Sequence, residues 1–202
     1  MLHKSTVAQP TLVLLNELMN MEALSSFVLV GGTALSLQIG HRISFDLDLF
    51  TPSNFDENQL LSVLIEKYPK TIVTLKDKNT LNLVINSIKV DFMRHNFPNL
   101  STVIEEESIR LISMEDIAAM KVNAICNRGC KKDFYDIYFL LKLFSMQEIF
   151  QFFAEKYKNT DVFFAQKSLL YFEDANAEPN PNTIEALSWG EVKKEIENQL
   201  RK

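Results

Sequence analysis

The stretch from Val28 to Phe50 constrains the fold more than any other part of this chain. It begins with a short apolar run typical of a buried strand, breaks at Gly31-Gly32, and continues with helix-forming residues. Gly40 is suited to end that helix, because glycine adopts the left-handed backbone conformation at little cost. The stretch therefore predicts a strand, a tight turn, a helix and a second strand in succession.

The second predicted strand, Ser44–Phe50, brings two carboxylates to one face. Asp46 and Asp48 are two residues apart, so they lie about 6.5–7 Å apart along the strand and point the same way. The opposite face is predicted to carry the apolar residues Phe45, Leu47 and Leu49. Neighbouring carboxylates repel unless a positive charge lies between them, and a hard divalent cation such as Mg²⁺ meets that need.

The turn Gly31-Gly32-Thr33 offers a second chemical feature. A helix that starts directly after a strand presents unpaired backbone N–H groups and the positive end of its dipole, which together bind phosphate. Glycine allows a ligand to approach the backbone closely. A Gly-Gly turn alone is most often only a turn, and an Asp-x-Asp strand alone is most often a solvated face. Their combination in one short stretch indicates a functional site.

Two segments of this stretch, Gly31–Thr33 and Gly40–Phe50, form one ordered motif that reads Gly-Gly-Thr and then Gly-His-Arg-Ile-Ser-Phe-Asp-Leu-Asp-Leu-Phe. The motif resembles the first motif of the AbiEii/AbiGii toxin family, whose members are nucleotidyltransferase-like proteins of the DNA polymerase β superfamily. The resemblance implies the fold and the chemistry of that superfamily. The phosphates of a nucleoside triphosphate would lie on Gly31, Gly32 and Thr33, and Ser44 would belong to the same nucleotide-binding set. Arg42 would either touch phosphate as part of that set or hold the turn before the Asp-x-Asp strand.

The resemblance also implies a third carboxylate beside the Asp-x-Asp strand. Asp91 lies in the middle of the otherwise apolar segment 88–95 and looks like that residue, although an acid there is most often exposed at a sheet edge. Together Asp46, Asp48 and Asp91 would hold two Mg²⁺ ions. Asp91 would also be placed to accept the proton of the attacking hydroxyl.

A later part of the chain matches the family as well. Lys121 lies on an apolar helical stripe, where a lysine usually extends its ammonium group to the surface. Lys121, Arg128 and the run 132–141 resemble the family's later motif, which implies that Lys121 and Arg128 bind phosphate. Asp136 would be a site residue or a partner that orients Lys121 or Arg128. Asp133 is explained equally well as a helix cap.

The remaining pattern predicts an α/β (α+β) protein. We expect a nucleotidyltransferase core over residues 1–112, with a small mixed, mostly antiparallel sheet and flanking helices. A C-terminal helical bundle over residues 113–202 is expected to pack on that core. Strands are predicted at 27–30, 44–50, 71–75, 81–85 and 88–95, and a tight hairpin at Asn86-Ser87 is predicted to join the last two. Helices are predicted at 11–24, 34–39, 56–68, 113–127, 133–144, 146–157, 162–172 and 184–200.

Composition argues against several classes of protein. A net charge of −5 argues against a general coat for nucleic acid. The two cysteines, Cys126 and Cys130, have no nearby histidine and are predicted to be reduced thiols without a disulfide. No apolar run approaches the roughly 20 residues of a membrane span, so a soluble, cytoplasmic protein without a membrane partner is expected.

These features predict a Mg²⁺-dependent nucleotidyltransferase that moves a nucleotide from an NTP to an RNA such as tRNA, or to a protein. By family analogy it would be the toxin of a bacterial toxin–antitoxin or phage-defence system, with a cognate antitoxin. Two alternatives stay open. One is a nucleotide-binding regulator without turnover, which the three carboxylates disfavour; the other is a protein-interaction module.

Overall fold

The computed structural model describes residues 1–201 and divides the chain into two compact units. The first unit contains Met1–Gly40, Ser44–Pro98 and Val103–Ile112, and the second contains His41–Ile43, Asn99–Thr102 and Ser113–Lys202. Lys202, the last residue of the predicted helical half, lies outside the described residues. Two short segments therefore belong to the second unit although their neighbours in the chain belong to the first.

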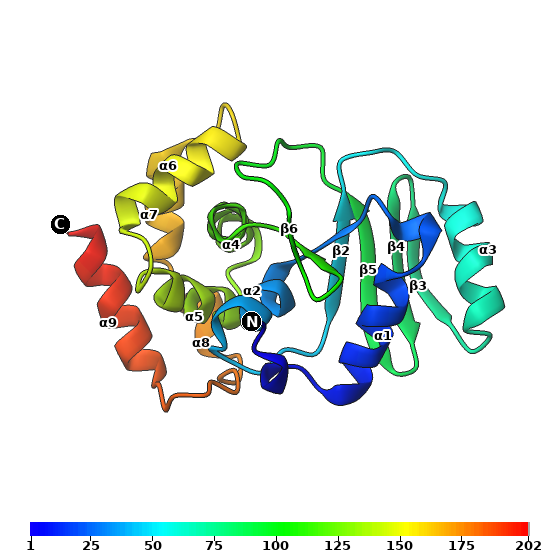
Figure 1. The fold of residues 1–202 in the computed structure, drawn as a ribbon. Coiled ribbons are helices and arrows are strands. Elements are labelled where there is room, and N and C mark those ends of the chain that lie inside the picture. The colour runs from blue at the N-terminus through cyan, green and yellow to red at the C-terminus, as the bar shows by residue number, and fades with distance from the viewer. Residues whose placement is uncertain (202) are drawn as a thin grey trace. The chain divides into compact units, whose positions relative to one another are not determined.

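The first unit is built on a seven-stranded mixed sheet with the order β3-β4-β5-β2-β1-β7-β6. Figure 1 shows β2, β5, β4 and β3 side by side. β2 runs parallel to β5 and β1 parallel to β7, and the other pairs are antiparallel, which confirms the predicted mixed sheet. The strands are β1 Val28–Val30, β2 Leu47–Thr51, β3 Ile72–Asp77, β4 Thr80–Ile85, β5 Ile88–Arg94, β6 Ile104–Glu106 and β7 Ile109–Leu111.

Helices of the first unit begin and end where the sequence places local signals. Asp56 caps α3 by accepting hydrogen bonds from the backbone N–H groups of Asn58 and Gln59. Gly40 ends α2 with a φ of 69°, as predicted. The helix predicted over 11–24 is shorter and is followed by a separate 3₁₀ turn. The elements are η1 Lys4–Thr6, α1 Gln9–Met19, η2 Glu22–Leu24, α2 Gly31–Ile39 and α3 Glu57–Lys67.

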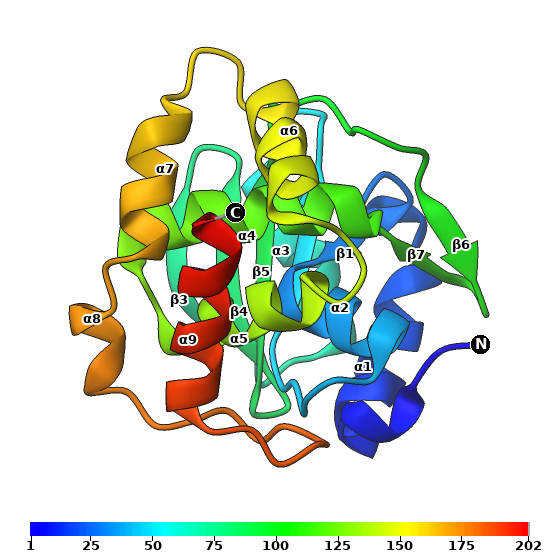
Figure 2. The same ribbon diagram turned by 90° about the vertical axis from the view of Figure 1, so that its left-hand side faces the viewer.

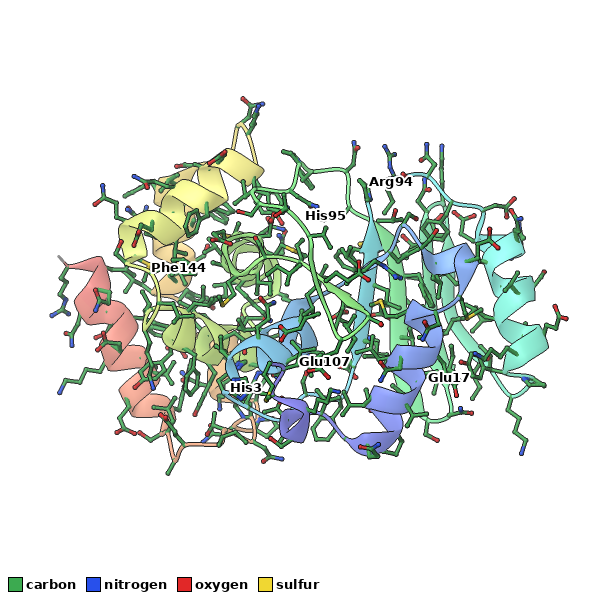
Figure 3. The ribbon with its side chains drawn as sticks, viewed as in Figure 1. His3, Glu17, Arg94, His95, Glu107 and Phe144 are labelled. Carbon is green, nitrogen blue, oxygen red and sulfur yellow. The ribbon has the colours of Figure 1, made fainter. Side chains whose placement is uncertain are left out.

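The two faces of the central strands differ in burial. Alternate residues of β2 and β5 are almost inaccessible, namely Leu47, Leu49, Val90 and Phe92. The residues between them are half-buried and include Asp48 and Asp91. Just after β5, the ring of His95 lies between the rings of Phe50 and Phe97, with centroid separations of 5.7 and 5.0 Å. Figure 3 labels His95, its neighbour Arg94, and Glu17 on α1.

Two features of the sheet differ from the sequence-based expectation. β6 and β7 lie where the sequence predicted no strands, and they form a hairpin whose turn is Glu107-Ser108, with φ values of 52° and 63°. Neither turn residue is Gly or Asn, so the usual hairpin signal is missing. β2 begins at Leu47, and Phe45 is 57% exposed instead of sharing the buried face. The hairpin predicted at Asn86-Ser87 is confirmed, with φ values of 50° and 67°.

The second unit is helical, and Figure 2 shows α4, α5, α6, α7 and α9 as separate rods. Capping boxes at Ser145 and Ser188 start α6 and α9, so the last helix begins at Trp189 and not at Ile184. The ring of Phe144, which Figure 3 labels, contacts the ring of Phe152. The helices are α4 Met114–Arg128, α5 Lys131–Leu140, α6 Met146–Lys156, α7 Val162–Leu169, α8 Glu173–Asn176 and α9 Trp189–Leu200.

A buried ion pair ties the segment Asn99–Thr102 to these helices. Asp116 and Lys156 are fully buried, and the Lys156 Nζ lies 2.6 Å from the Asp116 Oδ1. Asp116 also accepts hydrogen bonds from the backbone N–H groups of Leu100 and Ser101. Within residues 1–201 no helix has both the length and the apolar character that crossing a membrane requires.

Candidate active site

The start of α2 is shaped by the carboxylate of Asp48. Gly31 is the first residue of the helix and has a φ of +69°, which favours glycine. A Cβ at Gly31 would collide with the Asp48 carboxylate, with its Cγ only 3.2 Å away. Asp48 therefore lies against the first residue of α2, at the positive end of the helix dipole.

Replacing Gly31 with alanine is expected to lower the free energy of unfolding by about 1–3 kcal/mol, because it adds both a left-handed strain and a clash with Asp48. Chemical denaturation measures this loss. Gly190→Ala is the matched control, since a Cβ there would meet only the Ser188 Oγ at 3.9 Å. Equal stability of Gly31→Ala and the wild type would contradict the contact.

Thr33 and Ser44 hold the segment that leads into β2. The two hydroxyls lie 2.8 Å apart, and Thr33 Oγ1 donates to the backbone carbonyl of Asp46. The Ser44 N–H donates to the Thr6 carbonyl at 2.9 Å. Both hydroxyls are buried, so in this structure they fix the backbone before the carboxylates. Nucleotide binding by Thr33 and Ser44 stays a prediction.

The two strand carboxylates meet across the parallel β2–β5 pair. Asp48 and Asp91 are direct partners in the register, so their side chains project from the same face of neighbouring strands about 4.8 Å apart. Asp46 precedes Asp48 by two residues. Lys89, on β5, pairs with Asp91, with its Nζ 2.9 Å from the Asp91 Oδ2. The pairing of Asp48 with Asp91 joins residues that lie far apart in the sequence.

The charges of Asp46, Asp48 and Asp91 all act on the ammonium group of Lys89. The hydrogen bond that Lys89 donates to Asp91 raises the pKa of Lys89, and the charges of Asp91, Asp46 and Asp48 act in the same direction against the effect of burial. The Lys89 ammonium therefore lies in the combined field of Asp46, Asp48 and Asp91. A cation is the species that this arrangement favours.

The three carboxylates fit a divalent metal in chemistry and in strand register. Carboxylate oxygens are the ligands Mg²⁺ prefers, and the Asp91 Oδ1 is buried without a hydrogen-bond partner among residues 1–201. As the side chains of the described residues stand, no three His, Cys, Asp or Glu groups close around a common metal position. Metal binding by Asp46, Asp48 and Asp91 is therefore a proposal.

The second unit contains a buried ionic network centred on Asp136. This carboxylate accepts hydrogen bonds from His41 Nε2 and Arg42 Nε, each at 2.7 Å, and from Arg42 Nη2 at 3.0 Å. Lys121 Nζ pairs with Asp136 and lies 2.7 Å from the Oδ1 of Asp133. Burial alone would raise the pKa of Asp136, but the charges of Arg42 and Lys121 hold that pKa well below its usual range.

The same network sets the charge of its other members. Burial acts to lower the pKa of Lys121, yet Asp133 and Asp136 raise it above its ordinary value, so Lys121 is a buried ammonium. Burial lowers the pKa of His41, which keeps the imidazole neutral at pH 7. Arg128 Nη2 lies 3.1 Å from the Oδ2 of Asp133, and the Arg128 side chain is 55% exposed.

The network refines what the sequence predicted for this motif. Asp136 is a partner of Lys121 and Arg42, and it is Asp133 that pairs with Arg128. Capping does not explain Asp133, because Cys130 is the N-cap of α5 and Asp133 lies in its first turn with both oxygens on cations. Sequence reasoning gave His41 no role, although its place beside Arg42 in the first motif was a usable signal. Lys121 does not extend to the surface.

The predicted site residues thus form two sets within the chain. One set belongs to the first unit and comprises Gly31, Gly32, Thr33, Ser44, Asp46, Asp48 and Asp91. The other belongs to the second unit and comprises Arg42, Lys121, Arg128 and Asp136.

Comparisons with known proteins agree with this architecture. A family model described as nucleotidyl transferase AbiEii toxin, type IV TA system, matches residues 13–202. An uncharacterized protein of Aquifex aeolicus is 33% identical over 195 residues, which cover 91% of this chain and 95% of that protein.

Two solved structures resemble the fold. MenT4, a nucleotidyltransferase toxin from Mycobacterium tuberculosis, has a TM-score of 0.59 at 14% identity, over 93% of this chain and 82% of that chain. JHP933 from Helicobacter pylori has a TM-score of 0.55 at 16% identity, over 96% of this chain and 92% of that chain. At these identities the two likenesses concern the fold alone.

Proposed function

Because the chain belongs to the AbiEii family of nucleotidyl transferase toxins, we propose that it transfers a nucleoside monophosphate from an NTP to an acceptor hydroxyl with the help of Mg²⁺. The observation that carries this proposal is the register of β2 and β5, which pairs Asp48 with Asp91 on one face and leaves Asp46 two residues upstream. Three acidic side chains in one field are the donor set that nucleotidyl transfer needs.

The site residues of the first unit would have separate roles in this reaction. The backbone N–H groups of Gly31 and Gly32 would bind the phosphates, and Thr33 would keep the segment before Asp46 in position. Asp46, Asp48 and Asp91 would hold Mg²⁺. When bound, the metal would neutralise charge on the attacking and leaving oxygens of an in-line displacement at the α-phosphorus.

Proton transfer is assigned to Asp91. Asp91 is the register partner of Asp48, and its carboxylate would accept the proton of the acceptor hydroxyl as the new P–O bond forms. The bond from the α-phosphorus to the bridging oxygen breaks, and pyrophosphate leaves.

Arg128 and Lys121 of the second unit would assist the transfer by supplying positive charge. Arg128 is half-exposed while paired with Asp133, so its guanidinium is accessible to phosphate. Lys121 and Arg42 are held rigidly by Asp133 and Asp136, and a phosphate contact by Lys121 would replace one of these carboxylates. We assign Lys121 and Arg128 to neutralising the developing negative charge.

Family membership supports a proposal for the biological setting. We propose a bacterial toxin that acts in the cytoplasm on an RNA such as tRNA, or on a protein, within a toxin–antitoxin or phage-defence system. A cognate antitoxin would restrain it. The net charge of −5 favours an acceptor that is recognised locally over one held by a general basic surface.

Thermal melting with each of the four NTPs, with and without Mg²⁺, tests the proposal. A nucleotide at a hundredfold excess over its Kd stabilises by about 2.7 kcal/mol, which corresponds to a rise in Tm of about 5–10 °C. We expect that rise with one or two NTPs, only with Mg²⁺, and not in Asp48→Asn.

Glu66→Gln is the matched control, because it removes one exposed carboxylate of the first unit away from the proposed site. This variant is expected to respond to NTP and Mg²⁺ like the wild type. A shift with NTP that survives in Asp48→Asn and needs no metal would indicate a nucleotide-binding regulator. No shift with any NTP would favour an interaction protein.

A further inference from the structure

Lys89 holds a position among the acidic side chains that an ordinary surface lysine does not. It precedes Asp91 by two residues on β5, so both side chains project from the same face of the sheet. Its Nζ lies 2.9 Å from the Asp91 Oδ2, while the Lys89 side chain is 52% exposed and that of Asp91 only 14%. The ammonium therefore reaches the carboxylate from the solvent side.

The surroundings of this ammonium are strongly negative. Asp91 is the register partner of Asp48, and Asp46 lies on the segment that enters β2. Like charges so close together destabilise one another, and a positive charge among them relieves that repulsion.

Lys89 pairs with only part of the acceptor oxygens around it. The Asp91 Oδ1 and the Oδ1 of Asn82 are buried, and neither has a hydrogen-bond partner among residues 1–201. Asn82 on β4 is the direct register partner of Asp91, so Asp48, Asp91 and Asn82 form one row across three neighbouring strands. Lys89 contacts one oxygen of this row, and buried acceptors without donors are costly.

A divalent cation would meet these oxygens better than the lysine does. An ammonium offers three donors on a flexible stem, whereas Mg²⁺ takes six oxygen ligands and carries twice the charge. The ammonium is half-exposed, so it can leave without opening the core. Lys89 therefore neutralises part of the negative charge through its pair with Asp91, and its exposure allows another cation to replace it.

We propose that Lys89 is a displaceable internal counter-ion, which neutralises Asp91 and its neighbours in the metal-free protein and is expelled when the divalent metal binds. This inference rests on the metal site of the proposed function. It implies that Lys89 weakens the affinity of the protein for free metal. It also implies that the expelled ammonium becomes available to the negative charge of an incoming triphosphate.

Binding of Mn²⁺ to the full chain without nucleotide tests the competition, measured by the loss of the free Mn²⁺ signal in electron paramagnetic resonance. Lys89→Met is expected to bind Mn²⁺ about tenfold more tightly than the wild type, the Coulomb effect of one nearby charge after discounting for solvent exposure. Lys89→Arg keeps the charge and is expected to bind like the wild type. Lys78→Met removes an exposed lysine from the same unit and is expected to change nothing.

Melting in EDTA supplies a readout of the counter-ion itself. Lys89→Met is expected to melt below Lys78→Met without metal, and saturating Mn²⁺ is expected to remove the difference. Equal Mn²⁺ affinity in Lys89→Met and wild type would overturn the proposal, as would weaker binding or no Mn²⁺ binding by either. Asp48→Asn separates the two ideas, because undiminished Mn²⁺ binding in that variant would refute the metal site of the proposed function.

Discussion

Replacing Asp48 with asparagine is expected to lower the rate of nucleotidyl transfer by about a thousandfold and to leave the fold intact. Asp48 is the register partner of Asp91 and lies against Gly31 at the start of α2, so it belongs to the carboxylate set and contacts the proposed phosphate-binding segment. A bound metal contributes several kcal/mol to transition-state stabilisation, and each 1.36 kcal/mol is a factor of ten in rate. Asparagine has nearly the same shape but lacks the charge that holds the metal.

A transfer assay with radiolabelled NTP measures this loss, once the acceptor is supplied as extract or as purified RNA. Circular dichroism and the melting temperature show whether the fold is retained. Asp46→Asn is expected to behave in the same way, and Glu66→Gln is the control for the loss of one exposed carboxylate. If Asp46→Asn/Asp48→Asn together kept full activity, the metal assignment would be wrong.

Replacing Asp136 with asparagine is expected to lower the free energy of unfolding by about 3–5 kcal/mol. The Asp136 carboxylate is fully buried and pairs with Arg42 and Lys121, while His41 donates a further hydrogen bond. Removing its charge takes one carboxylate away from both Arg42 and Lys121, while Lys121 keeps its pair with Asp133. Breaking a buried ion pair from one side has a cost of this size because the remaining charge stays desolvated.

Chemical denaturation followed by circular dichroism measures the effect. Glu185→Gln is the matched control, because the Lys142–Glu185 pair is exposed and its loss is expected to change stability by less than about 1 kcal/mol. A change below about 1 kcal/mol in Asp136→Asn would show that the network is not a structural element. Asp136 would then have to act through the reaction alone.

Local sequence signals determined much of the first unit. The apolar run before Gly31-Gly32 became β1, and α2 is followed by Gly40, where only a residue that tolerates a positive φ fits well. The predicted turn at Gly31–Thr33 is instead the first turn of α2, which begins three residues before the predicted helix. Asn86-Ser87 formed the predicted hairpin. These elements depend on contacts between residues close in the chain, so backbone preferences and side-chain alternation are sufficient to predict them.

Other local features were hidden from the sequence. Phe45 continues the apolar alternation of β2, yet it is exposed because Thr33 and Ser44 fix the backbone before the strand begins. The β6–β7 hairpin turns at Glu107-Ser108 without the glycine or asparagine that marks such turns. In both cases tertiary contacts outweigh the local pattern.

The order of amino acids is enough to predict which residue types are available and which face of its own element each one takes: the Asp-x-Asp strand, the Gly-Gly turn and the lysine helix. Which of these groups meet became visible in the folded chain. The parallel pairing of β2 with β5 sets Asp48 opposite Asp91 and brings Lys89 into the acidic field. The physical reason is that alternation fixes the direction of a side chain along its own strand or helix, whereas its partner depends on register and packing between segments far apart in the chain.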